Sequence, residues 1–589
     1  MPENSKGRIV GVNGNLLTVE FDTSVIQNEV AFVILGDMRL KSEVIRVRGN
    51  RADLQVFEST DQIRIGDTVE FTGSLLSATL GPGLLKQVYD GLQNPLNKLA
   101  EKSGFFLERG VYLDALDYET QWDFTPTAAP GDKLRAGDRI GWVPEGIFQH
   151  WIMVPFAFRG IWEVVSVAEK GSYKPKDTMA VLRNARGEER TVSMVQEWPV
   201  KIPISCYKEK ILPVEPLITQ QRIIDTFFPV AQGGTFCTPG PFGAGKTVLQ
   251  HAISQFAEAD VVIVAACGER AGEVVEILRE FPELKDPRTG KTLIDRSIII
   301  CNTSSMPVAA REASVYTAVT LAEYYRQMGL HTLLLADSTS RWAQALREMS
   351  NRMEELPGAD AFPVDLSAII SNFYARAGMV ILNNGQRGAV TFIGTVSPAG
   401  GNLKEPVTES TKKAARCFYA LEQNRADQKR YPAVNPIDSY SKYLEYPEIK
   451  EYLDKTVEQG WVERIVEAKN IVRRGREAND QINILGDDGV PMSYHETFWK
   501  SELLDFCFLQ QDAFDAVDSL CPIERQKFML DLLLDICHRE FTFENYEECR
   551  AYFKDLINLL RQMNYSEWQS EAFESYRSQI SKFVEENGK

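Results

Sequence analysis

The stretch that decides the fold reads Gly240-Pro241-Phe242-Gly243-Ala244-Gly245-Lys246-Thr247. It matches the pattern G-x-x-x-x-G-K-[S/T] at every fixed position. Glycines at these positions let backbone N–H groups turn inward around phosphate oxygens, and a helix that follows adds the positive end of its dipole. Residues from Val248 onward read as a helix, and residues 234–237 read as a strand. The sequence therefore predicts a phosphate-binding loop between a strand and a helix.

This loop predicts which residues meet a nucleotide. Lys246 should reach the β- and γ-phosphates of ATP, and the Thr247 hydroxyl should bind Mg²⁺. The residues expected around the phosphates are Gly240, Pro241, Phe242, Gly243, Ala244, Gly245, Lys246, Thr247 and Val248.

Two hydrophobic runs beyond the loop end in acidic residues. Residues 331–336 lead into Asp337, which we expect to hold Mg²⁺ through a water. Residues 261–267 lead through Gly268 into Glu269 and Arg270. An ATPase with such a loop needs one carboxylate on the metal and another group that orients the attacking water. We expect Glu269 to polarise that water and Arg270 to contact the transferred phosphate; the alternative for Glu269 is a helix cap or a surface ion pair.

The pattern of apolar and polar residues along the sequence predicts a multidomain α/β protein. Apolar and polar residues alternate near the N-terminus, buried-strand runs separated by helical segments follow the loop, and only helical periodicity remains near the C-terminus. A short helical stretch is expected to end at Pro95. The predicted parts are a β-barrel (1–72), a connector (73–110), an inserted β-rich module (111–195), a RecA-like P-loop α/β nucleotide-binding domain (196–435) and an α-helical bundle (436–589).

Composition excludes several classes of protein. The 589 residues carry 65 basic and 82 acidic side chains, a net charge of −17, which disfavours broad binding to nucleic acids or anionic membranes. The longest apolar run, residues 261–267, is far shorter than the ~20 residues of a membrane-spanning helix. The N-terminus has no apolar core, so we expect no secretory signal. Nine cysteines without a C-x-x-C pair suggest reduced thiols.

Over nearly its full length, the chain resembles the catalytic A subunit of the V/A-type rotary ATPases. The phosphate-binding loop carries the Phe242 that marks this subunit. Other segments that match the family are residues 215–219, 225–229, 281–287, 306–314, 337–342 and 396–401.

The resemblance implies roles for particular residues. Glu269 corresponds to the catalytic carboxylate, and Arg270 and Arg341 resemble the arginines near the γ-phosphate. Tyr431 resembles the aromatic residue that stacks on adenine. The two residues that resemble the rest of that adenine pocket are Phe508 and Phe514.

The resemblance also implies cofactors and partners. Catalysis would use ATP or ADP with Mg²⁺. Three A subunits would alternate with three B subunits in a ring, and each B subunit would supply an arginine finger. Central and peripheral stalks would couple the ring to a membrane sector that moves H⁺ or Na⁺. The chain would be a cytoplasmic protein that is peripheral on the cytoplasmic face of a membrane, with the inserted module facing the peripheral stalks and no role in binding nucleic acid.

Some positions depart from the family pattern. Residues 268–273 read Gly-Glu-Arg-Ala-Gly-Glu, which shifts a glycine by one place. Ala361-Phe362-Pro363 and Ile369 replace a family Gly-Tyr-Pro and a following arginine, so we expect a local contact of the family, one to the partner subunit, to differ here. Ala244 stands where eukaryotic vacuolar relatives have a regulatory cysteine, which excludes disulfide control through this position.

Three other functions are alternatives to a catalytic subunit of a rotary ATPase. A hexameric nucleic-acid translocase, such as a Rho-like terminator, would need basic clusters that this acidic chain lacks. A non-hydrolysing ring subunit, like the B partner, would have no use for Lys246 or Glu269. A flagellar or type III secretion ATPase would lack the inserted module at residues 111–195.

Overall fold

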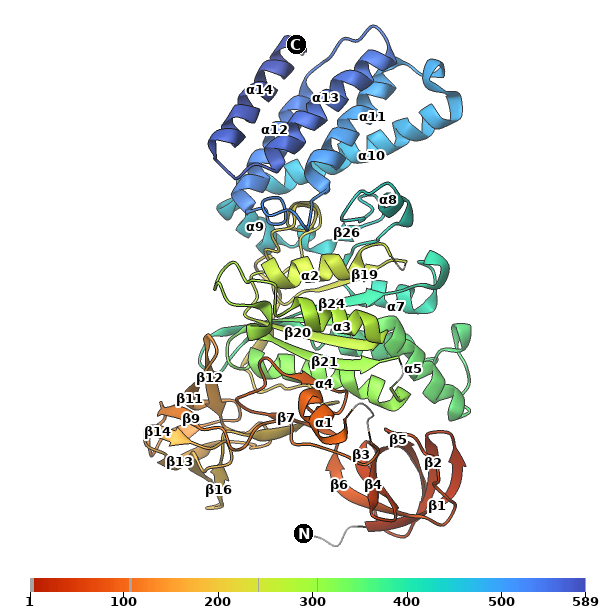
Figure 1. Ribbon diagram of the computed structural model, residues 1–589. Coiled ribbons are helices and arrows are strands. Elements are labelled where there is room, and N and C mark those ends of the chain that lie inside the picture. The colour runs from red at the N-terminus through yellow and green to blue at the C-terminus, as the bar shows by residue number, and fades with distance from the viewer. Residues whose placement is uncertain (1–4, 105–107, 242, 305, 588–589) are drawn as a thin grey trace. The chain divides into compact units, whose positions relative to one another are not determined.

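The computed structural model describes residues 5–104, 108–241, 243–304 and 306–587. The chain divides into two compact units (Figure 1). The first comprises Met1–Ile211 and Ala259–Thr395, and the second comprises Leu212–Glu258 and Val396–Lys589. Each unit is therefore built from two separate stretches of sequence.

The first unit begins with a closed six-stranded β-barrel of order β1-β2-β5-β4-β3-β6. In β2 the buried residues Leu17, Val19 and Phe21 alternate with half-buried ones, which is the pattern of a strand with one face toward a core. The barrel confirms the fold predicted for the N-terminus. Its strands are β1 (Ser5–Asn13), β2 (Leu16–Phe21), β3 (Glu29–Leu35), β4 (Met38–Arg48), β5 (Arg51–Val56) and β6 (Thr68–Leu75).

The segment after the barrel differs from the prediction in its helix. The short helix α1 (Leu96–Ser103) begins after Pro95 rather than ending there. Proline lacks an N–H and favours the start of a helix, where that donor has no partner. Strand β7 (Ser77–Leu80) pairs with β17 (Gln196–Pro199).

The predicted β-rich module is present, and it consists of two four-stranded sheets. Phe124, Phe158 and Trp162 are buried together in its core with aliphatic residues. The first sheet has the order β12-β11-β9-β14 and the second β10-β13-β15-β16. The strands are β9 (Trp122–Pro126), β10 (Lys133–Leu134), β11 (Arg139–Glu145), β12 (Phe148–Met153), β13 (Trp162–Val167), β14 (Gly171–Tyr173), β15 (Ala180–Asn184) and β16 (Glu189–Val192).

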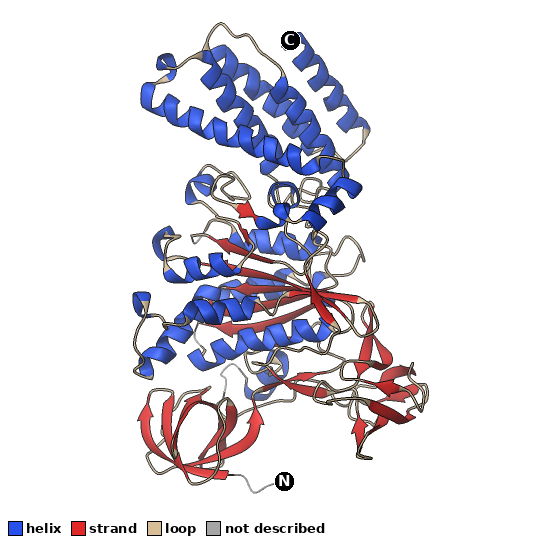
Figure 2. Ribbon diagram, turned by 180° about the vertical axis from the view of Figure 1, so that it is seen from behind, coloured by secondary structure: helices blue, strands red, loops and turns tan. Residues whose placement is uncertain are grey.

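The remainder of the first unit is a sheet with helices (Figure 2). Parallel strands lie in the order β24-β22-β20-β21-β8, and β23 and β18 extend the sheet in antiparallel fashion. Strand β20 is buried over almost its whole length, as expected of a parallel strand covered on both faces. The strands are β8 (Val88–Tyr89), β18 (Glu209–Ile211), β20 (Val261–Glu269), β21 (Ser297–Thr303), β22 (His331–Asp337), β23 (Gly378–Ile381) and β24 (Arg387–Val396). The helices are α3 (Ala271–Glu280), α4 (Val308–Arg326), α5 (Thr339–Arg352) and α6 (Leu366–Tyr374).

The second unit contains the phosphate-binding loop and the C-terminal helices. Three short strands, β19 (Thr235–Pro239), β25 (Cys417–Phe418) and β26 (Tyr440–Ser441), pair in the order β26-β25-β19. Two π-helical segments span Ile223–Phe227 and Asp505–Leu509. The α-helices are α2 (Lys246–Phe256), α7 (Pro406–Ala414), α8 (Gln423–Asp427), α9 (Pro447–Thr456), α10 (Trp461–Leu485), α11 (Met492–Leu504), α12 (Ile523–His538), α13 (Tyr546–Asn564) and α14 (Glu571–Asn587).

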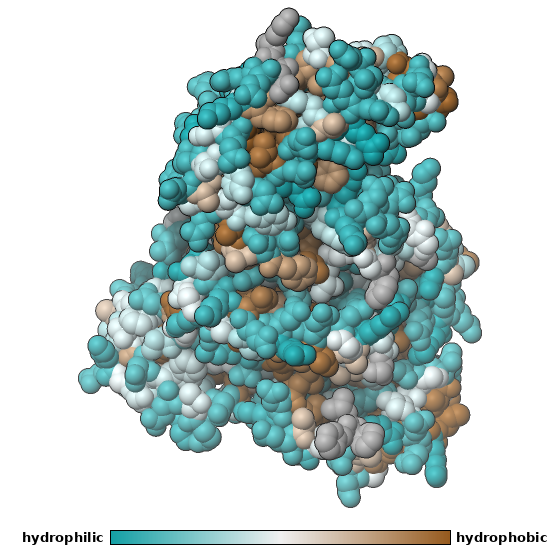
Figure 3. All heavy atoms as spheres, turned by 45° about the horizontal axis from the view of Figure 1, so that its top comes forward, coloured by the Kyte–Doolittle hydropathy of each residue, from teal (hydrophilic) through white to brown (hydrophobic). Residues whose placement is uncertain are grey.

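The surface and the thiols agree with the composition. On the face drawn in Figure 3, hydrophilic side chains cover most of the surface and hydrophobic ones form separate patches. Within the described parts of the chain, no helix combines the length and apolarity needed to cross a membrane. The cysteines, all of them described, are free thiols, and eight of the nine are buried.

Candidate functional site

The phosphate-binding loop lies between β19 and α2, as the sequence predicts. Gly243 and Gly245 have φ angles of 84° and 85°, in the left-handed region that favours glycine. A Cβ atom added to Gly240 would lie 2.6 Å from the Cβ atom of Leu421. Backbone conformation therefore favours glycine at positions 243 and 245, and close packing favours it at position 240. Phe242, which we expected in this loop, lies outside the described residues.

Lys246, the first residue of α2, turns its side chain back over the loop. Its Nζ atom donates hydrogen bonds to the carbonyl oxygen of Gly240, at 3.0 Å, and to the hydroxyl of Ser397. The ammonium group is therefore held beside the loop that would cradle phosphate oxygens. Thr247 follows in the first turn of α2, half-buried.

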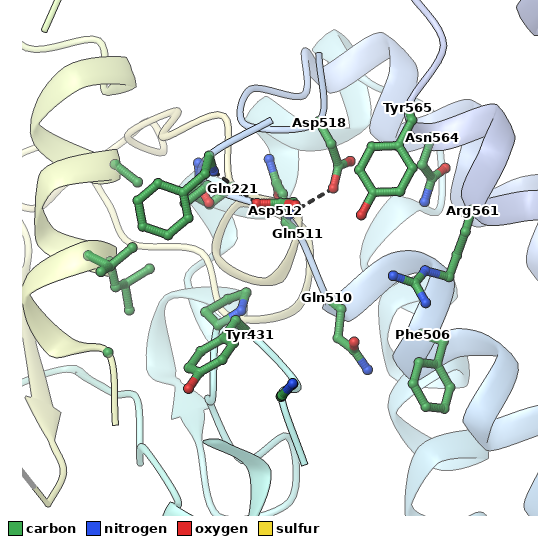
Figure 4. A pocket seen from close by; sticks show the side chains of 18 of the residues that line it. Gln221, Tyr431, Phe506, Gln510, Gln511, Asp512, Asp518, Arg561, Asn564 and Tyr565 are labelled. Atoms are coloured by element: carbon green, nitrogen blue, oxygen red, sulfur yellow. Dashed lines mark hydrogen bonds between the residues drawn. The ribbon is translucent and has the colours of Figure 1, made fainter. Parts of the chain in front are cut away.

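A cavity of about 470 Å³ opens beside this loop, entirely within the second unit (Figure 4). Its volume falls in the range of small-molecule sites. Gly243, Gly245 and Val248 line one wall. Most of the other lining residues come from far along the chain, and these include Tyr431, Phe506, Gln510, Gln511, Asp512, Phe514, Arg561, Asn564 and Tyr565.

Tyr431 and Phe514, which the resemblance assigns to an adenine pocket, both line this cavity. Carbon atoms of the Tyr431 ring lie 3.5 Å from the position of a Cβ atom on Gly245, so the ring packs against the phosphate-binding loop. Phe514 is 86% exposed, which leaves its ring available to a ligand. An exposed aromatic ring at a cavity beside a phosphate loop suits stacking on a nucleotide base.

Phe508 corrects the sequence prediction, because it does not line the cavity. It is fully buried, and its ring lies 5.8 Å from that of Phe227. Phe506, two residues earlier, lines the cavity instead, with the guanidinium of Arg430 4.7 Å from its ring. Both belong to the π-helix Asp505–Leu509, whose wider turn changes which side chains share a face. The family resemblance pointed to Phe508 and did not single out Phe506.

The predicted carboxylates lie at the carboxyl ends of two neighbouring strands in the first unit. Glu269 is the last residue of β20 and Asp337 the last of β22, and the strands run parallel with Ala266 paired to Asp337. The hydroxyl of Thr395 donates a hydrogen bond of 2.6 Å to Asp337 Oδ1. Carboxyl ends of parallel strands are the usual place for ligands in open α/β sheets.

The carboxylates at this edge affect each other. Burial, a hydrogen bond with Glu273 and the negative charge of Asp337 together raise the pKa of Glu269 to about 8, although a hydrogen bond from Ser338 opposes the shift. A cation near these groups would favour their charged forms. The edge is therefore suited to a positive charge.

Two arginines lie next to Gly268, close to the carboxyl end of β20. A Cβ atom on Gly268 would approach Arg341 Cβ to 2.7 Å and Arg311 Nε to 3.0 Å, and the φ angle there is 71°. The Arg341 guanidinium donates to the side chain of Gln344 at 3.1 Å. Arg311 was not predicted; its Nε atom is buried with no hydrogen-bond partner among the described residues. Arg270 is exposed at the start of α3.

The two predicted ligands, each taken by itself, have the oxygen chemistry that Mg²⁺ prefers. Among the described residues, no group of three or more Cys, His, Asp or Glu side chains could hold a metal ion. The candidate ligands are instead one hydroxyl, Thr247, and one carboxylate, Asp337. Mg²⁺ is usually bound by one or two such oxygens together with water and substrate phosphates.

Family models match four parts of the chain. The nucleotide-binding domain of the ATP synthase alpha/beta family matches residues 220–441. The beta-barrel domain of that family matches residues 9–73, and the barrel-sandwich domain of its subunits matches residues 113–201. The C-terminal domain of V and A type ATP synthase matches residues 450–545.

Individual relatives match the chain from end to end. The V-type ATP synthase alpha chain of Treponema denticola is 53% identical over 582 residues, which cover 99% of this chain and 97% of that protein. The alpha chain of Borrelia turicatae is 52% identical and covers 98% of both chains. Alpha chain 1 of Treponema pallidum is 53% identical, over 99% of this chain and 96% of its own. This chain therefore belongs to the ATP synthase alpha/beta family and, within it, to the V-type ATP synthase alpha chains.

Proposed function

We propose that this chain is the catalytic subunit of a V-type rotary ATPase, which couples hydrolysis or synthesis of MgATP to ion transport across a membrane. The observation that carries this proposal is the intact phosphate-binding loop beside the cavity, in a chain that matches V-type ATP synthase alpha chains over 97–99% of its length. A subunit without catalytic work would not need Lys246 and Glu269 together.

In this proposal the phosphates of ATP meet the backbone N–H groups of the loop and the ammonium of Lys246. The purine base extends into the cavity, where Tyr431, Phe506 and Phe514 offer aromatic surface. The Lys246 hydrogen bonds to Gly240 and Ser397 hold the ammonium in place before the nucleotide arrives. Binding then requires little reorganisation of this side chain.

Hydrolysis requires that a water molecule be aligned with the γ-phosphorus. We assign this step to the carboxylate of Glu269, which accepts a hydrogen bond from the water. Arg341, Arg270 and Lys246 would offset charge that develops on the phosphoryl oxygens. Thr247 and Asp337 would hold Mg²⁺, Asp337 through a water, and this ion would neutralise charge on the β- and γ-phosphates.

The assembly is proposed from family membership. The chain would alternate with B subunits in a six-membered ring, and each B subunit would contribute an arginine finger worth roughly 10³–10⁵ in rate. Stalk subunits would link the ring to a membrane sector for H⁺ or Na⁺, and the chain would then lie on the cytoplasmic face of that membrane. Domain boundaries near residues 72, 110, 195 and 435 are proposed for this architecture.

The experiment that tests this function is co-expression of the chain with its B subunit, followed by sizing and an ATPase assay. We expect a hexamer-sized complex that hydrolyses MgATP at least about 10³-fold faster than the chain alone, because the finger is supplied by the neighbour. Equal rates in the two samples would contradict the proposed division of labour. RNA-stimulated hydrolysis by the chain alone would favour a translocase instead.

A further inference from the structure

Arg222 is a buried cation that makes several hydrogen bonds to a distant segment of the chain. It is 1% exposed and directly precedes the π-helix Ile223–Phe227. Its Nη1 atom lies 2.5 Å from Asp518 Oδ1, and its Nε atom donates to the carbonyl oxygen of Phe508 at 2.9 Å. Its Nη2 atom donates to the carbonyl oxygen of Gln510 at 2.5 Å. A single guanidinium thus holds both ends of the segment from Phe508 to Asp518.

The backbone of the same segment is held at further points. The N–H of Arg222 donates to Gln511 Oε1 at 2.8 Å, and the N–H of Asp512 donates to Asp518 Oδ2 at 2.8 Å. The N–H of Gln511 donates to the carbonyl oxygen of Tyr431 at 2.9 Å. The segment is therefore fixed against Arg222 on one side and against the proposed base-stacking tyrosine on the other.

This segment presents Gln510 to the cavity. Gln510 lines the cavity, and Figure 4 shows its side chain between Tyr431 and Phe506 in that view. Its Nε2 atom is buried and has no hydrogen-bond partner within the part of the chain that the structure describes. A buried amide without a partner costs free energy, which a ligand acceptor would recover. The N1, N3 and N7 atoms of adenine are acceptors of this kind.

We infer that Arg222, paired with Asp518, is a positioning residue that holds the Gln510–Phe514 segment against the base of a bound nucleotide, where the Gln510 carboxamide hydrogen-bonds to the base. This inference rests on the proposed function. Arg222 does not line the cavity, so it acts through the segment and not by contact with the ligand.

The chemistry of the pair explains why arginine is needed. A planar guanidinium offers donors in a fixed fork, so it bonds a carboxylate and two carbonyl groups at once. Lysine carries the same charge on a flexible stem and cannot reproduce this geometry. Arg222→Lys should therefore keep the buried charge pair while releasing the segment.

The test measures binding of MgATP and of Mg-tripolyphosphate to the full-length chain by isothermal titration calorimetry. Tripolyphosphate has no base, so it reports on the phosphate-binding loop alone. For Arg222→Lys we expect the Kd for ATP to rise about 5- to 50-fold, the effect of one or two hydrogen bonds, and for Gln510→Ala about 2- to 13-fold. The Kd for tripolyphosphate should stay within twofold of wild type in both variants.

Controls separate positioning from general damage. Arg296→Lys changes another buried arginine, paired with Asp286 at 2.8 Å in the first unit, and should leave both Kd values unchanged. If Arg222→Lys does not fold, Asp518→Asn, which keeps the size and an acceptor oxygen, carries the same expectation. Equal weakening of ATP and tripolyphosphate, or unchanged ATP binding in folded variants, would overturn the inference. Failure of the wild-type chain to bind either ligand would overturn the proposed function itself.

Discussion

At the scale of single residues, two neighbouring phenylalanines have opposite surroundings. Phe506 is half-buried at the nucleotide cavity, whereas Phe508 is fully buried against Phe227. Both residues belong to the same π-helical turn. A substitution of Phe506 therefore tests ligand binding, and a substitution of Phe508 tests core packing. The pair therefore offers a matched comparison within five residues of sequence.

We predict that Phe506→Ala weakens ATP binding about 5- to 150-fold, since stacking on one base is worth roughly 1–3 kcal/mol, and barely changes the melting temperature. Phe508→Ala should instead lower the free energy of unfolding by about 3–5 kcal/mol, the usual cost of a large cavity. Calorimetric titration and thermal unfolding measure the two effects, with Tyr431→Ala as a positive control for binding. Equal effects of both substitutions on affinity would contradict the placement of Phe506.

At the scale of secondary-structure elements, α10 packs an unusual side chain against the nucleotide-binding core of the second unit. Lys469 of this helix lies 4.7 Å from the ring of Phe228. Burial lowers the pKa of Lys469 to about 8. A charged form is therefore costly at this place in the helix.

The free energy of unfolding should depend on pH through Lys469. Because the pKa is lower in the folded chain than in the unfolded chain, stability rises with pH between about 8 and 10.4. Below about pH 8 the folded chain retains the full cost of the buried charge. Lys469→Met should thus raise the unfolding free energy by about 1–3 kcal/mol at pH 7, and the gain should vanish above about pH 10.5. Thermal unfolding at several pH values measures this.

A matched control for that measurement is Lys455→Met in α9, where the lysine side chain is 71% exposed. This substitution should give no pH-dependent gain. A gain at Lys469 that is independent of pH would show that better packing, and not removal of a charge, is the cause.

How far the sequence predicts each element depends on the range of the interactions. The strands expected at 261–266, 297–300 and 332–335 appear as β20, β21 and β22, because long apolar runs are local signals. The phosphate-binding loop was also predicted from a local signal, the motif at residues 240–247. The resemblance assigned Phe508 to the adenine pocket, but the structure buries this side chain and places Phe506 at the cavity. A resemblance gives matching positions, whereas the side chain that faces the cavity depends on how the π-helical turn packs.

Other parts of the site could not be predicted because they depend on contacts distant in sequence. Arg222 hydrogen-bonds to Asp518, which lies 296 residues later in the sequence. Arg561 and Asn564 of α13 line the same cavity as Gly245. Each of these residues, taken alone, reads as an ordinary polar position on a helix or loop. Arg311 falls within the family-matching segment 306–314, but only the folded chain places it beside Gly268.

At the scale of the whole molecule, the proposed reaction draws residues from both compact units. Lys246 and the nucleotide cavity belong to one unit, and Glu269, Asp337 and Arg341 belong to the other. The inserted β-module belongs to the unit that carries the carboxylates. His150 of this module hydrogen-bonds Glu145 at 2.5 Å and the Tyr324 hydroxyl of α4 at 2.8 Å. The module is thus fastened to its host by a buried polar network.

We predict that replacing residues 115–190 by a short Gly/Ser linker leaves ATP binding within about threefold of wild type, because every residue lining the cavity belongs to the other unit. The melting temperature should fall, since Tyr324 loses its partner. In reconstituted membranes the assembled deletion variant should hydrolyse ATP without pumping ions, as expected if the module docks a peripheral stalk. A folded variant that no longer binds ATP would make the module part of the nucleotide site.

The central claim is that this chain carries out the hydrolytic step, and Glu269→Gln tests it most directly. The measurement is the MgATP hydrolysis rate of the ring assembled with the B subunit, together with the nucleotide affinity of the same ring. Glutamine keeps the shape of glutamate but cannot act as a base toward water, so turnover should fall at least ~10²-fold while ATP still binds. A variant ring that retains more than about a tenth of the wild-type rate would contradict a contribution of that size and remove Glu269 from its assigned role.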